Sequence, residues 1–325
     1  MSAIKQVELV CVTPVFEDVE ASSRLFKELN KEMGPDIYIV VVDDGSVRQP
    51  VDVVSLQEAG LLGVVIKLKR NVGHQKAIAI GLSYVADKFL DVKQVIVMDS
   101  DGEDLPATIS QLLAPLTRSD VDMVVAQRKS RFETMSFRIF YMMYKLIFKL
   151  LSGREISFGN FMAIKPAALK RMAAMQELWI HIAGCALNSK LRIITCPLDR
   201  GPRYAGQSKM SFVGLALHGF KGLMVFAEDV LVRVGIACTL VAAMSIIGSG
   251  VAIGLKLFNY ATPGWFSVAL GILFLVFIQT GALTLMTLML TGVVRGGLVV
   301  NGDYFDFIEK LTHTNTHEHP PVIDD

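Results

Sequence analysis

Short apolar runs alternate with amphipathic segments through the first part of the chain. The apolar runs have the length of buried strands, and the amphipathic segments repeat their apolar residues at helical spacing. The predicted elements, in chain order, are strand Val7–Thr13, helix Glu20–Glu32, strand Ile37–Val42, strand Leu62–Leu68, helix Gln75–Phe89, strand Gln94–Met98, helix Thr108–Leu116 and strand Met123–Ala126. This alternation is typical of an α/β fold with a doubly wound, mainly parallel sheet.

Two longer apolar segments follow in the second half of the chain. No charged residue occurs from Val234 to Leu255 or from Pro263 to Val294. Each run exceeds the about 20 residues that a helix needs to cross the hydrocarbon core of a bilayer. Buried core helices are the alternative, but such helices normally carry a polar stripe, whereas these runs hold mainly small and hydroxyl residues between the apolar ones. The sequence therefore predicts a hairpin of two transmembrane helices.

Basic residues flank the predicted spans. Lys221 and Arg233 precede the first span, and Arg295 follows the second. The connection Lys256–Thr262 carries a single basic residue, and this bias predicts that both termini are cytoplasmic. The segment Met1–Val12 lacks a continuous apolar core, so we interpret it as a strand rather than a signal peptide. We expect an integral protein of the inner (plasma) membrane with a cytoplasmic active domain.

The composition agrees with such a protein. Hydrophobic residues make up 52% of the chain, more than one α/β domain needs, and the formal net charge is only +1. That charge gives no general case for nucleic-acid binding, so basic functions must come from local clusters. The cysteines are scattered, with no Cys-x-x-Cys pair, which indicates neither a disulfide framework nor a zinc site and fits a reducing compartment.

Two further segments suit a membrane interface. Phe137–Leu151 places Arg138, Lys145 and Lys149 among aromatic and aliphatic residues, a pattern of interfacial helices, although an ordinary core helix with a basic outer face would also fit. Phe212–Val230 has a similar character. The expected division is 1–210 cytoplasmic domain, 211–232 interfacial helix, 233–294 two transmembrane helices and 295–325 cytoplasmic tail, disordered after Thr312.

Acidic residues directly follow two of the predicted strands. Asp43 and Asp44 follow one strand, and Asp99 and Asp101 follow another. Ligands of such sheets bind beyond the carboxyl ends of the strands. In an extended segment alternate residues share a side, so Asp99, Asp101 and Glu103 are expected to point the same way. Three carboxylates together favour Mg²⁺ or Mn²⁺, which would bridge bound phosphates; a solvated acidic loop is the alternative.

Five segments of the chain stand in an informative order. They are Thr-Pro-Val-Phe-Glu-Asp at 13–18, Val-Asp-Asp-Gly-Ser at 42–46, Arg-Asn-Val-Gly-His-Gln-Lys-Ala at 70–77, Met-Asp-Ser-Asp-Gly-Glu-Asp-Leu-Pro at 98–106 and Gly-Gln-Ser-Lys-Met-Ser at 206–211. With the two spans, this set resembles the polyprenyl-phosphate glycosyltransferases related to dolichol-phosphate mannose synthase and bacterial undecaprenyl-phosphate sugar transferases, within the family 2 glycosyltransferases. The resemblance covers most of the chain.

The resemblance implies a GT-A-like fold with a metal-dependent donor site. Donor nucleotide-binding residues would be Pro14, Phe16, Asp18, Asp43, Asp44 and Asp99, and the metal ligands would be Asp99, Asp101 and Glu103, with Asp101 also catalytic. Asn160 stands where related enzymes shape the sugar pocket. Two positions depart from the family pattern: Glu103 replaces the usual Gln, and Glu17-Asp18 replaces a frequent Asn-Glu. An extra negative charge is therefore expected near the metal.

The acceptor in this family would be a lipid phosphate. A phosphate monoester has a second pKa of about 6, so the attacking oxygen is already anionic at neutral pH and needs positioning rather than a strong base. Arginine suits bidentate contact with phosphate. We assign the acceptor phosphate to Arg128, Arg131, Arg200, Arg203 and Lys209, of which Arg128 and Arg131 are also assigned to catalysis. A solvated surface position is the alternative for each one; His74 is expected to pack rather than to touch the donor.

The sequence thus predicts an inverting hexosyltransferase that moves a sugar from a nucleotide sugar, with UDP-glucose favoured, to undecaprenyl phosphate. Its partners would be these two substrates and the membrane, without nucleic acid, and homo-oligomer formation stays open. A processive polysaccharide synthase is one alternative, but neither Trp179 nor Trp265 lies in the Gln-x-x-Arg-Trp segment that it needs. A non-catalytic membrane scaffold is another, against which the intact Asp99 and Asp101 argue.

Overall fold

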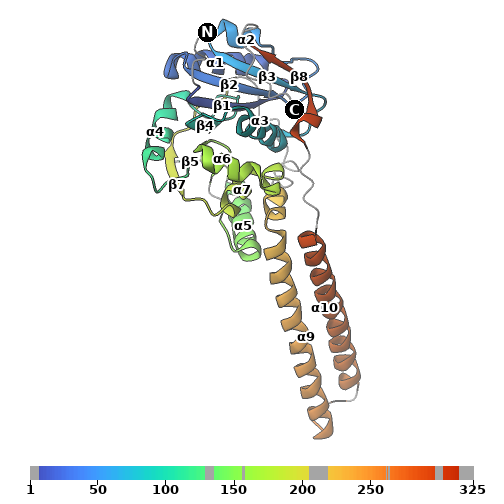
Figure 1. The fold of residues 1–325 in the computed structure, drawn as a ribbon. Coiled ribbons are helices and arrows are strands. Elements are labelled where there is room, and N and C mark those ends of the chain that lie inside the picture. Colours follow the sequence, from blue (N-terminus) through green and yellow to red (C-terminus); the bar gives the residue numbers. More distant parts are fainter. Residues whose placement is uncertain are drawn as a thin grey trace. The chain divides into compact units, whose positions relative to one another are not determined.

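The computed structural model describes residues 7–128, 135–155, 158–204, 219–260, 262, 264–296 and 303–314. The chain divides into two compact units (Figure 1). The first comprises Met1–Arg138, Ile156–Val225 and Val300–Asp325, and the second comprises Ile139–Glu155 and Phe226–Val299. The first unit therefore contains segments from before and after the long apolar helices.

An eight-stranded sheet forms the centre of the first unit, in the order β7-β5-β6-β4-β1-β2-β3-β8. The strands are β1 Leu9–Val15, β2 Ile37–Asp43, β3 Leu62–Leu68, β4 Gln94–Val97, β5 Met123–Arg128, β6 Met162–Ile164, β7 Ile193–Leu198 and β8 Ile308–His313. The pairs β1–β2, β1–β4, β2–β3 and β5–β7 are parallel. Antiparallel pairing involves only β6, against β4 and β5, and β8, against β3, among the described strands. The mainly parallel sheet is confirmed.

Helices cover both faces of this sheet (Figure 1). They are α1 Val19–Met33, α2 Val54–Glu58, α3 His74–Lys88, α4 Ile109–Leu113, α6 Pro166–Ala173 and α7 Ile182–Asn188, with short 3₁₀ turns η1 Pro106–Thr108, η2 Ala114–Thr117, η3 Gln176–Trp179 and η4 Tyr304–Phe307. Alternate side chains of β1 pack on opposite faces of the sheet, in two separate hydrophobic cores. Val10 and Val12 pack with α3, and Cys11 packs with α1. Burial on both faces explains the continuous apolar runs of the central strands.

The prediction of one continuous helix over Thr108–Leu116 is wrong. The segment forms η1, α4 and η2 in succession. Pro115 has no backbone N–H to continue the α-helical hydrogen bonds, and its ring opposes the carbonyl one turn earlier. The chain therefore tightens into a 3₁₀ turn at Ala114.

The C-terminal tail enters the sheet. Ile66 of β3 pairs with Leu311 of β8, and the Thr314 hydroxyl accepts the Gly63 N–H at 3.1 Å. The Gln57 amide donates to the Thr314 carbonyl at 2.7 Å. Disorder directly after Thr312 was therefore a wrong expectation, because β8 covers the exposed hydrogen-bonding edge of β3; residues 315–325 lie outside the described residues.

The second unit contains α5 Met135–Ser152 from Ile139 onward, together with the long helices α9 Ala227–Leu257 and α10 Trp265–Gly296. α9 has 31 residues and includes an 18-residue stretch with a mean hydropathy of 2.3, and Trp265–Leu290 of α10 has 26 residues and includes such a stretch with a mean hydropathy of 2.2. Both are long and apolar enough to cross a membrane. α9 starts before the predicted span, so that Glu228 and Asp229 lie in its first turn. Of the predicted interfacial segment 211–232, residues 211–218 lie outside the described part.

Candidate active site

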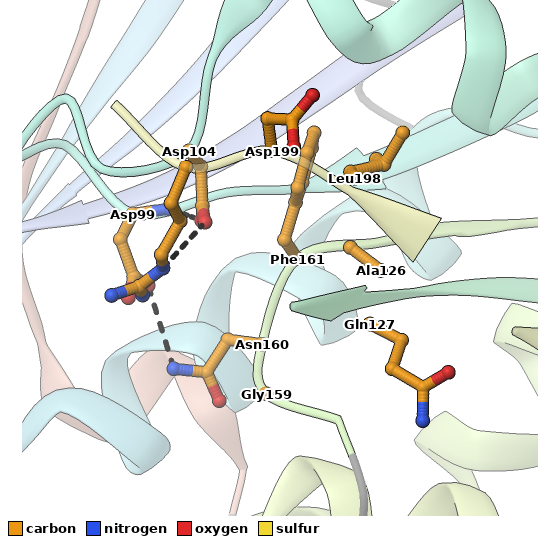
Figure 2. Close-up of a pocket in the computed structure, with 10 residues that line it drawn as sticks. Asp99, Asp104, Ala126, Gln127, Gly159, Asn160, Phe161, Leu198 and Asp199 are labelled. Carbon is orange, nitrogen blue, oxygen red and sulfur yellow. Dashed lines mark hydrogen bonds and ion pairs between the residues drawn. The ribbon is translucent and has the colours of Figure 1, made fainter. Parts of the chain in front are cut away.

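Residues from four neighbouring strands meet at the end of the sheet where β4, β5 and β7 terminate. Because β6 runs antiparallel to β4 and β5, its amino end lies beside the carboxyl ends of β4, β5 and β7. A cavity of about 40 Å³ opens there (Figure 2). It is lined by Asp99, Asp104, Ala126, Gln127, Gly159, Asn160, Phe161, Leu198, Asp199 and Arg200. Of the predicted site residues, the sheet thus brings together Asp99, Asn160 and Arg200.

The acidic loop, Asp99–Asp104, follows β4 and folds back on itself. The Asp101 carboxylate accepts the Glu103 N–H at 3.0 Å, and the Asp104 carboxylate accepts the Asp99 N–H at 3.1 Å. Gly102 has φ 84, a left-handed conformation that most residues avoid. The loop is therefore a turn, and the extended alternation that the sequence suggested for its carboxylates is wrong.

A second segment, Asp199–Tyr204, packs directly on the acidic loop, and we call it the strap. The Gly201 N–H donates to the Glu103 carbonyl at 3.0 Å, and the Tyr204 N–H donates to the Asp101 carbonyl at 2.9 Å. The Tyr204 ring is so close to Gly102 that a Cβ on this glycine would stand 2.5 Å from it. The strap therefore lies against the loop through its backbone as well as through side chains.

Two arginines of the strap pair with the carboxylates of the loop. Arg203 Nη2 lies 2.9 Å from Asp101 Oδ2, and Arg203 Nε lies 3.2 Å from Glu103 Oε1. Arg200 Nη1 pairs with Glu103 Oε2, and Arg200 Nε lies 4.0 Å from Asp104 Oδ1. The two arginines that the sequence placed in an acceptor cluster thus contact the loop that it placed around the donor diphosphate.

A polar network supports Asp99 from the other side. His74, the first residue of α3, lies 3.1 Å from Asp99 Oδ1 through Nε2. Asn160 lies 2.8 Å from the same His74 nitrogen and 3.4 Å from Asp99 Oδ1. Gln75 donates to Asn160 at 3.0 Å and accepts the Ile182 N–H at 2.8 Å. His74 therefore reaches the site, contrary to the expected packing role. Gln75 is a buried positioning residue that was not among the predicted site residues, although it lies in the segment 70–77.

The charges at this edge shift the pKa values of its groups. Burial raises the pKa of Asp104, and the neighbouring Asp99 adds to the effect. Burial opposes ionisation of Asp99 too, but the charge of His74 and its hydrogen bond outweigh burial and hold the pKa of Asp99 below its usual range. Burial opposes protonation of His74, yet Asp99 raises the pKa of His74 overall. The ionised pair His74–Asp99 is thereby favoured, while burial makes ionisation of Asp104 less favourable than in water.

These carboxylates have the hard oxygen donors that Mg²⁺ or Mn²⁺ prefers. Their arrangement does not fit a metal site as it stands, because Asp101 and Glu103 face arginines and Asp99 faces His74. In the described part of the chain, no group of three or more His, Cys, Asp or Glu residues converges in a way that could hold a metal ion. A cation would have to exchange partners with the arginines to bind here.

The acids after β2 shape the neighbouring loops. Buried Asp43 accepts the Ser46 N–H at 2.9 Å and the Val51 N–H at 3.2 Å. Buried Asp44 accepts two backbone N–H groups of the loop before α3, at 2.7 and 3.0 Å. Burial raises the pKa of Asp44, and these two hydrogen bonds oppose that rise. Both residues thus have a structural role beside the predicted contact with the nucleotide.

The end of β1 carries the remaining predicted donor residues. Pro14 is buried in the strand, whereas the Phe16 side chain is 42% exposed. Glu17 has φ 49, and its carboxylate accepts backbone N–H groups of residues 47–49 at 2.8 to 3.1 Å. Those hydrogen bonds lower the pKa of Glu17. Asp18 caps α1 by accepting an N–H of its first turn, so the β1 end is tied to the loop after β2.

Several predicted basic residues are not placed by the structure. Arg128 ends β5, but its side chain is not among those described, and Arg131 and Lys209 lie outside the described residues. Asp199, on the strap, lines the cavity and was not predicted. It follows β7, a strand whose half-exposed pattern gave no clear signal in the sequence.

Comparison with known proteins agrees with this architecture. Residues 11–187 match the family described as Glycosyl transferase family 2. Two glycosyltransferases of Bacillus subtilis (strain 168) are similar: YkcC, 22% identical over 81% of this chain and 82% of its own length, and YkoT, 24% identical over 88% and 86%. The undecaprenyl-phosphate 4-deoxy-4-formamido-L-arabinose transferase of Enterobacter sp. (strain 638) is 25% identical over 66% of this chain and 65% of its own length.

Among solved structures, glucosyl-3-phosphoglycerate synthase from Mycobacterium tuberculosis aligns with a TM-score of 0.47 and 15% identity, over 70% of this chain and 79% of that chain. The family match runs from β1 into α7 and includes the acidic loop, His74 and Asn160. The match covers more than half of the chain, and the protein belongs to glycosyl transferase family 2.

Proposed function

We propose that this family 2 glycosyltransferase transfers a sugar from a nucleotide diphosphate to the phosphate of a polyprenyl lipid at the cytoplasmic face of a membrane. The observation that carries the proposal is the cavity at the carboxyl edge of the sheet, where the acidic loop meets Arg200 and Arg203. Anionic ligands need such fixed positive charge, and guanidinium groups match the geometry of phosphate oxygens.

The acceptor is proposed from chemistry and from the relatives. A lipid phosphate brings its own anionic nucleophile, so the enzyme has to orient it in line with the departing diphosphate rather than deprotonate it. Attack of the phosphate oxygen on the anomeric carbon inverts the configuration and releases the nucleoside diphosphate. The name of the Enterobacter relative includes undecaprenyl phosphate as acceptor, which supports the same class of lipid here. UDP-glucose is the first donor to test.

A divalent cation belongs to the proposal because of the carboxylates Asp99 and Asp101, whose oxygens would suit Mg²⁺ or Mn²⁺. Asp99, Asp101 and Glu103 stay proposed ligands. No step of the transfer is assigned to the cation, since the carboxylates contact His74 and the strap arginines in the arrangement described.

The membrane topology is proposed from the two apolar helices and from β8. Strand β8 follows α10 in the chain and yet pairs with β3, in the unit that precedes α9. A chain that leaves a folded unit and returns to it crosses a bilayer an even number of times. Two crossings, with the catalytic unit on the cytoplasmic side, agree with the flanking basic residues.

The proposal is tested by product analysis. The purified full-length protein is incubated with undecaprenyl phosphate, Mg²⁺ or Mn²⁺, and separately with UDP-glucose, other UDP-sugars and GDP-mannose, and the lipid fraction is weighed by mass spectrometry. The expected product has the mass of one hexose on undecaprenyl monophosphate. A sugar linked through a diphosphate, a growing polysaccharide or no lipid product with any donor would contradict the proposed reaction.

A further inference from the structure

We propose that Glu103 occupies Arg200 and Arg203 as a stand-in for the donor's diphosphate, and that both arginines pass from Glu103 to the diphosphate when donor and divalent cation bind together. The inference rests on the proposed function, because it needs a nucleoside diphosphate at this edge. In this proposal Glu103 forms ion pairs with the two arginines until the donor binds, and it is not a ligand of the cation.

The contacts of Glu103 carry the inference. One carboxylate oxygen pairs with Arg200 Nη1 and the other lies 3.2 Å from Arg203 Nε. Its backbone carbonyl accepts the Gly201 N–H at 3.0 Å. Glu103 is thus bound to the strap by both oxygens of its side chain and by its main chain, which leaves its carboxylate turned toward the strap.

The Glu103 carboxylate lies between two guanidinium groups, as a bound phosphate would. Arg200 and Arg203, three positions apart on the strap, both contact this carboxylate, as paired guanidinium groups contact a phosphate. Their side chains are 28% and 31% exposed, against 23% for Glu103. All three are accessible to a ligand that enters from solvent.

Charge balance then couples the two ligands. The loop carboxylates Asp101 and Glu103 are offset by Arg200 and Arg203 in the arrangement described. A diphosphate alone would compete with Glu103 for the arginines and would leave that carboxylate without its partners, whereas a cation alone would compete with the arginines for Asp101. When both enter together, the diphosphate binds the arginines and the cation offsets the Asp101 carboxylate that Arg203 leaves. Each ligand then lowers the cost of binding the other, and only Glu103 is left without a charged partner. Binding of each ligand should therefore strengthen binding of the other by the same factor.

The test measures ligand binding and needs no turnover. Titration calorimetry on the full-length protein in detergent determines the affinity for UDP, and in parallel for GDP, in excess chelator and in saturating Mn²⁺. In the wild type we expect the cation to strengthen nucleoside diphosphate binding strongly. In Glu103→Gln the arginines lose their charged partner, so we expect the affinity in chelator to rise about tenfold, the size of one charge-assisted contact, and the effect of the cation to shrink.

Two variants control the assignment. Asp120→Asn removes a carboxylate that pairs with Arg118 at 2.6 Å before β5, at the opposite edge of the sheet, and should leave both affinities unchanged. Adding Arg203→Gln to Glu103→Gln should abolish the gain in chelator, because the released guanidinium is then absent.

Each result has a distinct meaning. If Glu103 is a cation ligand instead, Glu103→Gln weakens binding in Mn²⁺ and does not change binding in chelator, which overturns the inference alone. Equal wild-type affinities with and without Mn²⁺ overturn it as well, independently of any variant. If the wild type binds neither UDP nor GDP under either condition, the inference and the proposed function both fail.

Discussion

At the scale of single residues, Gly102 determines whether the acidic loop and the strap can meet. Its φ of 84 and the Tyr204 ring 2.5 Å from an added Cβ both exclude a side chain. We expect Gly102→Ala to destabilise the first unit by about 2–4 kcal/mol, from the left-handed backbone and the overpacked ring together. Thermal denaturation of the detergent-solubilised protein measures the change.

Gly159→Ala is the matched control for that substitution. Gly159 lines the same cavity, but an added Cβ would meet no atom within 4 Å. Its denaturation midpoint should stay close to that of the wild type. Equal losses in the two variants would show that the contact with Tyr204 is not what excludes a side chain at Gly102.

A second residue-scale prediction concerns Asp122, which holds Arg192 at the amino ends of β5 and β7. Its two oxygens accept from the Arg192 guanidinium at 2.6 and 2.9 Å and from the Arg192 N–H at 2.9 Å. These hydrogen bonds lower the pKa of Asp122 to about 2. A carboxyl whose pKa is lower in the folded state stabilises the fold above its unfolded pKa of about 3.9, and loses that contribution as the pH falls through the folded value.

We therefore expect Asp122→Asn to reduce the free energy of unfolding by about 1 kcal/mol at pH 7. The difference from the wild type should shrink progressively between about pH 4 and pH 2, where the wild-type carboxyl also becomes neutral. Denaturation midpoints of both proteins across this range provide the measurement. A difference that is independent of pH would mean that the charge of Asp122 contributes nothing.

At the scale of elements, α5 presents an apolar surface beside the first long helix. Met142, Met143, Leu146, Ile147 and Leu150 are all exposed. The end of α5 is fixed to the start of α9, because Phe148 packs edge-on against Phe226 at 6.0 Å and Arg233 donates to the Leu150 carbonyl at 3.4 Å. A helix held at the start of a candidate membrane span suits the interfacial position that its sequence predicts.

That position is testable by fluorescence. We expect a tryptophan in Leu146→Trp to be quenched by brominated lipids in nanodiscs, beyond the quenching of the native tryptophans. Val47→Trp, at a position that is 85% exposed in the other unit, should add no quenched signal. If Leu146→Trp is no more quenched than Val47→Trp, α5 does not lie in the interface.

The elements also show what a sequence pattern can predict. Strands β1 to β5 carry apolar runs that only a buried strand explains, and their ends place Asp43 and Asp99 correctly. Strand β6 has three residues, and β8 does not alternate, because Glu309 and Lys310 are both exposed and the three residues after them are all partly buried. Neither strand therefore has a distinctive period. The pairing of Glu103 with Arg200 and Arg203 joins positions 97 and 100 residues apart, a contact that depends on the sheet order and not on local spacing.

At the scale of the whole molecule, β8 limits how the chain can cross a membrane. Residues 308–313 pair with β3, so the chain after α10 lies on the same side of any bilayer as the catalytic sheet. In the proposed two-span topology, the short connection between α9 and α10 lies on the opposite side. Tyr260 in that connection is 79% exposed, and the Glu309 side chain in β8 is 49% exposed, so both positions are open to reagents.

We expect opposite labelling of these two positions in a background without the native cysteines. In intact cells, a maleimide that cannot cross the membrane should label Tyr260→Cys but not Glu309→Cys, and permeabilisation should expose Glu309→Cys. The physical reason is that β8 cannot reach β3 from across a bilayer without breaking the sheet, while the basic residues on both outer flanks of the spans favour the cytoplasmic side. Labelling of Glu309→Cys in intact cells would place the catalytic sheet outside, away from cytoplasmic nucleotide sugars. Protection of both positions until permeabilisation would mean that α9 and α10 do not span the membrane, and the proposed lipid acceptor would lose its main structural support.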